Sequence, residues 1–173
     1  MYKKDVALYW KDKKAYWERI LKKLDLESKP GGQVLDVGCG PSGIYSVLTG
    51  QNVDAVDPLL NKYGSELKVF NPEMFPHVLF HPMEFEHFKT DKKYDFVFCM
   101  NSLNHFHNID LSIKKCAQLL KPNGQLAATI DSHKFPIVKK IFQWSGVDIL
   151  HPYQHTLSEY DRFFTVHGLI MQH

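Results

Sequence analysis

Cysteine is scarce in this sequence, which has 173 residues and only three cysteines, Cys39, Cys99 and Cys116. Their odd number and wide separation exclude a disulfide framework and give no metal-ligand spacing. Long apolar runs are missing as well, because no stretch approaches the roughly 18 apolar residues of a membrane span. The first residues also lack the apolar centre of a signal peptide. We therefore expect no metal, no membrane span and a cytoplasmic location.

An excess of charge of either sign is missing too, since the net charge is only +2. Such a small value gives no electrostatic argument for nucleic acid or for an acidic partner, and the sequence shows no basic stripe. Hydrophobic residues make up 44% and charged residues 23%, which is ordinary for a globular protein. We therefore expect a single domain over residues 1–173 and no nucleic-acid substrate.

Hydrophobic spacing predicts an alternation of helices and strands. Strands are expected at 33–37, 52–57, 77–80, 94–100 and 125–130, with 169–172 as a candidate sixth. Helices are expected at 2–24, between Ile44 and Gly50, and at 109–120, 134–144 and 156–168; residues 58–76 look irregular. The alternation predicts an α/β fold with a doubly wound, mostly parallel sheet over residues 33–173, preceded by a helical segment, 1–26. In such sheets ligands bind beyond the carboxyl ends of the strands.

The stretch "VLDVGCGPSG", Val34–Gly43, contains Gly38, Gly40 and Gly43 at the spacing of a dinucleotide-binding turn. Asp57 follows at about the 20-residue distance expected of an acid that binds a ribose. Asp36, however, precedes the first glycine, and its carboxylate would repel a doubly charged pyrophosphate in a partly desolvated site. A zwitterionic amino acid fits better, because its ammonium needs acceptors while its carboxylate can approach the turn. S-adenosylmethionine joins such an amino acid to a nucleoside.

Several segments resemble class I S-adenosylmethionine-dependent methyltransferases. These are "VLDVGCGPSG", "VDAVDP", "YDFVFCMNSLNHFHN", "LLKPNGQLAATI" and "HPYQHTLSEYDRFFTVHGL", in the order that the family uses. The resemblance implies S-adenosylmethionine as cofactor and places Asp57 on the ribose hydroxyls. The cofactor-binding residues that it implies, together with the reasoning above, are Asp36, Gly38, Cys39, Gly40, Asp57, Pro58, Leu59, Met83, Met100 and Asn101.

The chain departs from this family in three places. Pro82 stands where many members have an acid near the adenine, which leaves the backbone N–H of Met83 and the side chain of Leu59 or Phe85 as the expected adenine contacts. Asn123 replaces a glycine in a turn, which asparagine tolerates. The family normally ends with an antiparallel strand that has no counterpart before residue 173. An open sheet edge would favour a homo-oligomer.

His105 follows the fourth expected strand, where the family often has a histidine, and it is the candidate general base; a structural histidine is the alternative. His105 and His107 lack neighbouring carboxylates, so no metal is expected.

Candidate substrate contacts are spread over two segments of the chain. They are Tyr9 and Tyr16 in the first helix, and His151, Tyr153 and His155 before the last helix. The aromatic stripe of the first helix has three interpretations: core packing, a lid over the cofactor, or contact with a membrane surface.

The function expected from these observations is methyl transfer to a small organic molecule, with an O, N, S or C acceptor left open. The Asn/Asp-Pro-Pro-aromatic signature of enzymes that methylate planar amide and adenine nitrogens is absent, and "MNSLNH" stands in its place. Two alternatives remain. One is a cofactor-binding module without transferase activity, and the other is an NAD(P)-dependent reductase, which Asp36 disfavours.

Overall fold

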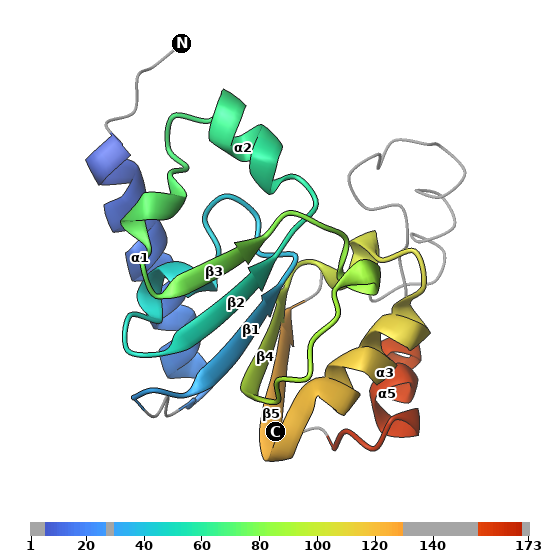
Figure 1. Cartoon of the computed structure of the whole chain (residues 1–173). Coiled ribbons are helices and arrows are strands. Elements are labelled where there is room, and N and C mark those ends of the chain that lie inside the picture. The colour runs from blue at the N-terminus through green and yellow to red at the C-terminus, as the bar shows by residue number, and fades with distance from the viewer. Residues whose placement is uncertain (1–5, 27–29, 130–155, 171–173) are drawn as a thin grey trace.

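The computed structural model describes residues 6–26, 30–129 and 156–170 (Figure 1). Its centre is a five-stranded sheet of order β3-β2-β1-β4-β5. The strands are β1 (Gln33–Val37), β2 (Asn52–Val56), β3 (Val78–His81), β4 (Tyr94–Met100) and β5 (Leu120–Thr129). Every pairing among them is parallel, which confirms the predicted doubly wound sheet. The strand order reverses between β1 and β4, the position where such sheets bind ligands.

Helices lie on both faces of the sheet. Successive side chains of a strand point to opposite faces, so both faces carry apolar side chains that the helices cover. The α-helices are α1 (Val6–Lys23), α2 (Leu60–Glu66), α3 (Ile109–Leu119) and α5 (Leu157–Val166). On one face Trp10 of α1 packs in a cluster with Val34 and Phe98. On the other face Tyr160 of α5 and Ile113 of α3 pack in a cluster with strand residues of β1 and β4. Figure 1 shows α3 and α5 together on the side of β4 and β5.

Two helix predictions differ from the structure. The segment after the glycine turn forms only a 3₁₀ turn, η1 (Ile44–Val47), instead of an α-helix. Residues 44–51 alone separate the turn from β2, and the Gln51 N–H already closes back onto the Leu48 carbonyl oxygen, so several helical turns do not fit. Conversely, residues 58–76 contain helix α2, which the sequence pattern did not predict because Gly64 disfavours a helix.

Most of the remaining predictions hold wherever the structure describes the residues. The last helix starts with a capping box between Thr156 and Glu159. Strand β5 begins earlier than expected, at Leu120, with an irregular register beside Tyr94. Asn123 has φ +64°, the left-handed conformation expected from its place in a glycine turn. Leu169 and Ile170 lie in no strand, and the predicted helix 134–144 falls outside the described residues.

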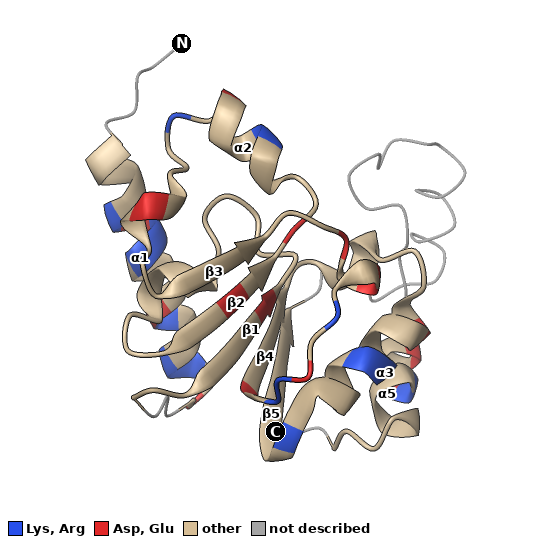
Figure 2. Ribbon diagram, in the orientation of Figure 1, with Lys and Arg blue, Asp and Glu red and all other residues tan. Residues whose placement is uncertain are grey.

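The charge distribution leaves the sheet largely uncharged. Figure 2 shows lysines and arginines on α1, on α3 and on the connection between β3 and β4, with acidic residues inside β1 and β2. The acids inside these strands are Asp36 and Asp54. Within the described ranges, no helix has the length and apolar character that crossing a membrane requires.

Candidate functional site

The glycine turn bends sharply over the carboxyl end of β1. Gly38 and Gly40 have φ of +66° and +61°, which favours glycine at both positions. A Cβ atom on Gly38 would lie 2.4 Å from the Cβ of Ser102, so the loop after β4 also requires a glycine there. The N–H groups of Gly38 and Cys39 donate to the Val56 carbonyl oxygen at 2.8 and 3.2 Å. The turn is therefore held between the ends of β2 and β4.

Asp57, the expected ribose acid, lies directly against this turn. Its Oδ2 accepts the Gly40 N–H at 2.9 Å, and its Oδ1 accepts the Leu59 N–H at 2.8 Å. Burial raises the pKa of the Asp57 carboxyl, while these two hydrogen bonds and the charge of His105 act in the opposite direction. Asp57 thus fixes the shape of the turn and keeps further lone pairs for a ligand hydroxyl.

Asp36 lies underneath the turn, and its side chain is almost fully buried. Its Oδ2 accepts the Tyr45 N–H at 3.2 Å. Gly43 leaves room for this carboxylate, because a Cβ atom there would come within 2.7 Å of the same oxygen. Burial raises the pKa of Asp36 to about 7, with a further upward contribution from Asp57 and a downward one from the Tyr45 N–H. When ionised, this carboxylate places a negative charge beneath the turn.

The loop after β4 supplies the other wall of the site. Met100 is buried, Asn101 is exposed with φ +56°, and Ser102 Oγ donates to the Val37 carbonyl oxygen at 2.7 Å. The next turn, η4 (Leu103–His105), exposes His105, whose charge influences Asp57. Asn104 is buried, and its amide oxygen and nitrogen find no hydrogen-bond partner among the described residues. The structure therefore brings the β4 end and the candidate base to the same region as the glycine turn.

Only some of the residues expected to contact adenine are placed to do so. Leu59 and Met83 are 47% and 38% exposed, so both offer apolar surface. The Met83 N–H, however, donates to the His81 carbonyl oxygen at 2.9 Å, and a contact from this residue would have to come from its side chain. The expectation for Phe85 is wrong, because its ring is buried in the cluster on the α3 and α5 face.

Helix α1 contacts the glycine turn through one serine. Tyr9 Oη donates to Ser42 Oγ at 2.9 Å, and Trp17 Nε1 donates to the Ser42 carbonyl oxygen at 2.7 Å. Trp10 is buried, which confirms core packing for this part of the stripe. Tyr16 is 43% exposed and packs edge-on against Trp17 instead of reaching the turn.

The other predicted substrate contacts, His151, Tyr153 and His155, lie outside the described residues. Cys39 is buried within the turn. Among the residues with a described placement, no three His, Cys, Asp or Glu side chains converge as metal ligands. Sequence reasoning missed the roles of Ser42 and Ser102, because a serine in a loop has many uses and neither belongs to a recognisable motif.

Comparisons with known proteins give a family and a fold. The sequence matches the methyltransferase domain family over residues 9–168. It is 31% identical over 105 residues to a ubiquinone biosynthesis O-methyltransferase of Rickettsia typhi, which covers 59% of this chain and 42% of that protein. The YcgJ protein of Bacillus subtilis superposes with a TM-score of 0.73 at 18% identity, over 90% of this chain and 68% of that one. A phosphoethanolamine N-methyltransferase of Haemonchus contortus, solved with S-adenosyl-L-methionine, gives 0.65 at 18% identity, over 89% of this chain and 36% of that one.

These matches differ in how much of each protein they cover and in what they show. The chain spans less than half the length of the Rickettsia enzyme, and the two superposed structures are similar in fold alone. The family match, by contrast, extends over residues 9–168 and so includes the glycine turn, Asp57 and the β4 loop. The protein therefore belongs to the methyltransferase domain family, the class I S-adenosylmethionine-dependent family that its motifs resemble.

Proposed function

We propose that this domain binds S-adenosylmethionine and transfers its methyl group to a small organic molecule. The observation that carries the proposal is the contact of Asp57 with the Gly40 N–H, directly above the buried Asp36. Two carboxylates at one glycine turn suit a ligand with a positive nitrogen and ribose hydroxyls. They would repel a pyrophosphate.

The residues present fit this cofactor. The turn has no side chain at Gly40, and a Cβ atom there would meet no described atom within 4 Å, so a ligand can approach the backbone closely at this position. Asp57 would accept the ribose hydroxyls, and the ionised Asp36 would favour the ammonium through its field. Leu59 and Met83 provide exposed apolar surface for the adenine.

The cofactor, when bound, supplies a methyl group that is already reactive. The chain's own task is therefore to hold the acceptor in line with that methyl group, and alignment of this kind can supply about 7–11 kcal/mol of the barrier. Met100 ends β4 and Asn101 follows it, where this alignment would occur, and α1 would limit the access of water from the side of Ser42. His105 would take a proton only from an acceptor that carries one, such as an alcohol, with an effect of roughly 10²–10⁴-fold.

The acceptor atom is a matter for experiment, since the named relatives include an O- and an N-methyltransferase. A cofactor-binding module without transferase activity is the second candidate. A departure from the family pattern motivates it, because Pro82 stands where many members have an acid near the adenine. Residence in the cytoplasm and self-association through an edge of the sheet, which ends at β3 and β5 among the described strands, complete the proposal.

Transfer of labelled methyl groups from S-adenosylmethionine to a metabolite extract tests the function. We expect a labelled small molecule with the wild type and a strongly reduced yield with Asp57→Ala at a cofactor concentration near the wild-type Kd. Leu111→Ala, an exposed position on α3, is the matched control and should keep full activity. If the cofactor binds but no fraction of the extract becomes labelled, the binding module is the correct interpretation.

A further inference from the structure

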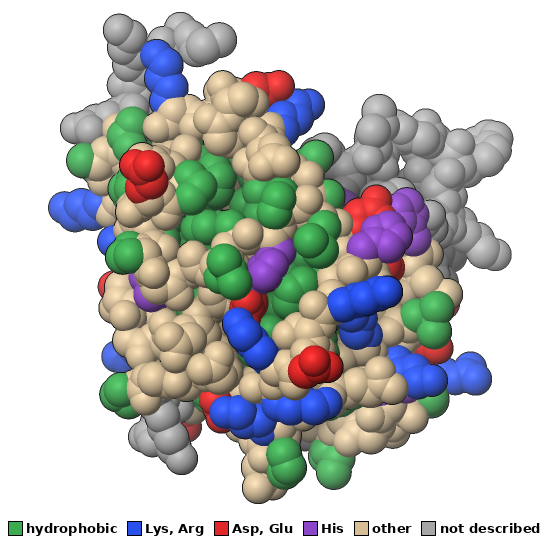
Figure 3. Space-filling model, viewed as in Figure 1, with side chains coloured by type: hydrophobic (Ala, Val, Ile, Leu, Met, Phe, Trp, Pro, Cys, Tyr) green, Lys and Arg blue, Asp and Glu red, His purple; other side chains and the backbone are tan. Residues whose placement is uncertain are grey.

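Helix α1 is attached to the rest of the molecule along a narrow stripe. Trp10 is the only buried residue among its 18, while Tyr9 and Trp17 are half-buried. Figure 3 shows lysine side chains at the surface over α1, and Lys11 is one of the exposed residues of this helix. Elements with few buried contacts open locally at a small cost in free energy. The docking of α1 can therefore respond to single contacts.

The polar contacts of α1 converge on one residue of the glycine turn. Tyr9 Oη donates to Ser42 Oγ at 2.9 Å, and Trp17 Nε1 donates to the Ser42 carbonyl oxygen at 2.7 Å. Tyr9 and Trp17 lie about two helical turns apart, yet they reach the same residue. Trp10 Nε1 makes a similar hydrogen bond elsewhere, to the Val69 carbonyl oxygen at 2.8 Å. Ser42 is thus the place where α1 meets the turn.

Ser42 belongs to the second half of the turn, which is held differently from the first half. The first half is bonded to the end of β2 and to Asp57, as described for the site. In the second half, the Pro41 carbonyl oxygen accepts the Tyr45 hydroxyl at 2.9 Å, from only four residues further along the chain. Trp17, by contrast, reaches Ser42 across 25 residues. Helix α1 therefore gives this half a long-range hydrogen bond.

The orientation of the Ser42 carbonyl group also affects the residue that follows. A trans peptide unit is planar, so fixing this carbonyl group fixes the direction of the Gly43 N–H as well. Gly43 lies against the buried acid, because a Cβ atom on it would come within 2.7 Å of Asp36 Oδ2. A rotation of this peptide unit would therefore change the surroundings of Asp36.

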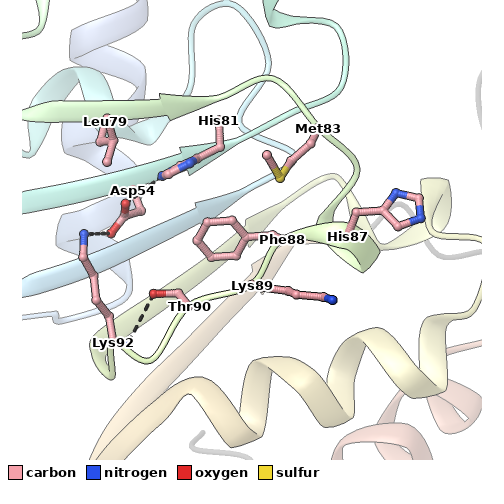
Figure 4. A pocket seen from close by; sticks show the side chains of 9 residues that line it. All are labelled: Asp54, Leu79, His81, Met83, His87, Phe88, Lys89, Thr90 and Lys92. Atoms are coloured by element: carbon pink, nitrogen blue, oxygen red, sulfur yellow. Dashed lines mark hydrogen bonds and ion pairs between the residues drawn. The ribbon is translucent and has the colours of Figure 1, made fainter.

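The connection between β3 and β4, which contains η3 (Phe85–His87), is held in another way. Figure 4 shows Lys92 and His81 directed at Asp54 of β2, at 2.8 and 2.7 Å. All side chains drawn there come from β2, β3 and the connection, and none comes from α1. The hydrogen bonds from α1 thus distinguish the glycine turn from this neighbouring connection.

We propose that Tyr9 and Trp17 are positioning residues of the cofactor site, which act through Ser42 and not by contact with the ligand. This inference rests on the proposed function. Docked α1 holds the turn in the shape that receives the cofactor. Because coupling between two binding equilibria is reciprocal, the bound cofactor stabilises the docking of α1 by the same factor.

Two tryptophan variants of α1 test the role of Trp17. Trp17→Phe removes the N–H that reaches Ser42 and keeps an aromatic ring, while Trp10→Phe makes the same change at the contact with Val69. In calorimetric titrations we expect the Kd for S-adenosylhomocysteine to be about fivefold weaker in Trp17→Phe, equivalent to about 1 kcal/mol. Trp10→Phe should bind like the wild type. Equal affinities of the two variants would overturn the proposal.

A double-mutant cycle tests whether Tyr9 acts through Ser42. Tyr9→Phe and Ser42→Ala each remove one partner of the same hydrogen bond. Each should weaken binding of S-adenosylhomocysteine about threefold, and the double variant should bind no more weakly than Ser42→Ala alone. Additive losses would show that Tyr9 contacts the ligand directly and would overturn its role as a positioning residue.

NMR of the ligand-free protein separates this inference from the proposed function. The Tyr45 N–H, which is bonded to Asp36 directly after the turn, should exchange with solvent at least about threefold faster in Trp17→Phe than in Trp10→Phe. On addition of S-adenosylhomocysteine, the indole N–H resonance of Trp17 should shift and that of Trp10 should stay in place. Equal exchange rates in the two variants would overturn the coupling. Failure of the wild type to bind S-adenosylhomocysteine, with the exchange rates as expected, would overturn the proposed function while the contact of α1 with the turn stands.

Discussion

Single residues determine the shape of the glycine turn, and its two left-handed glycines differ in an informative way. Gly38 faces Ser102 at a distance that no Cβ atom tolerates, whereas no atom of the described chain lies within 4 Å of a Cβ atom on Gly40. We expect Gly40→Ala to cost only the left-handed strain, about 1–2 kcal/mol of the free energy of unfolding. Gly38→Ala should cost clearly more, because Ser102 and its hydrogen bond to Val37 must also move. Urea unfolding of both variants measures this, and equal losses would contradict the assigned packing.

Asp36 gives a pH-dependent prediction at the same scale. Its pKa is raised by burial from 3.8 to about 7 in the folded state. The folded protein therefore holds a proton that the unfolded chain has lost, and this contribution to stability is complete below about pH 4 and disappears as the pH rises through about 7. Asp36→Asn cannot ionise. It should remove this part of the pH dependence, worth up to a few kcal/mol at about 1.36 kcal/mol per unit. Unfolding curves between about pH 4 and 8 should converge at the acid end; parallel curves would refute the assignment.

The residues themselves could be foreseen better than their surroundings. Asp57 and the two glycines follow from spacing, because a glycine turn with an acid at this separation is typical of a site that binds a ribose. The burial of Asp36 could not be foreseen, since it depends on how Gly43 and Tyr45 fold back over it. The engaged N–H of Met83 likewise depends on the local bend at Pro82, which the sequence alone does not reveal.

At the scale of elements, two connections between strands contain a short 3₁₀ turn and no α-helix. Only η1 follows β1 and only η3 lies between β3 and β4. A helix between Ile44 and Gly50 was a reasonable expectation from apolar spacing, but the short distance to β2 prevents it. Helix α1 then covers the side where η1 lies, through the contacts of Tyr9 and Trp17 with Ser42. The connection between β3 and β4 is held by the buried rings of Phe85 and Phe88 and by polar contacts such as that of Lys92 with Asp54.

Asp54 is the main polar anchor of that connection, because it joins β2 to Lys92, His81 and Tyr94. Burial alone would raise its pKa, but the hydrogen bonds from Lys92 and His81 outweigh burial and lower it. The stabilisation is therefore present at neutral pH and is lost as the pH falls through and below about 4. Asp54→Ala should lower the free energy of unfolding by about 1–3 kcal/mol at pH 7, because the buried Tyr94 hydroxyl loses this acceptor while the half-exposed Lys92 can turn to water.

The exposed pair between Lys121 and Asp95 is the control for this measurement. Lys121→Ala should cost less than about 1 kcal/mol, as exposed pairs do. Thermal and urea unfolding of the two variants at pH 7 would disprove the anchoring role if both lost the same small amount.

At the scale of the whole molecule, the doubly wound parallel sheet and the family were accessible from the sequence, because helices alternate with strands and the motifs occur in the family's order. The sequence predicts no helix between the third and fourth strands, and the structure has only the 3₁₀ turn η3 there. The account rests on one selection: the acids at the glycine turn favour a sulfonium amino acid joined to a nucleoside over a dinucleotide. A doubly wound parallel sheet by itself is compatible with either cofactor.

Calorimetric titration of the wild type with S-adenosylmethionine and with NADH, in the same buffer, tests this selection most directly. We predict measurable heat and a defined Kd for S-adenosylmethionine, no saturable binding of NADH, and a Kd for S-adenosylmethionine at least about tenfold weaker in Asp57→Ala, corresponding to about 1.4 kcal/mol or more. Saturable binding of NADH without binding of S-adenosylmethionine would contradict the account.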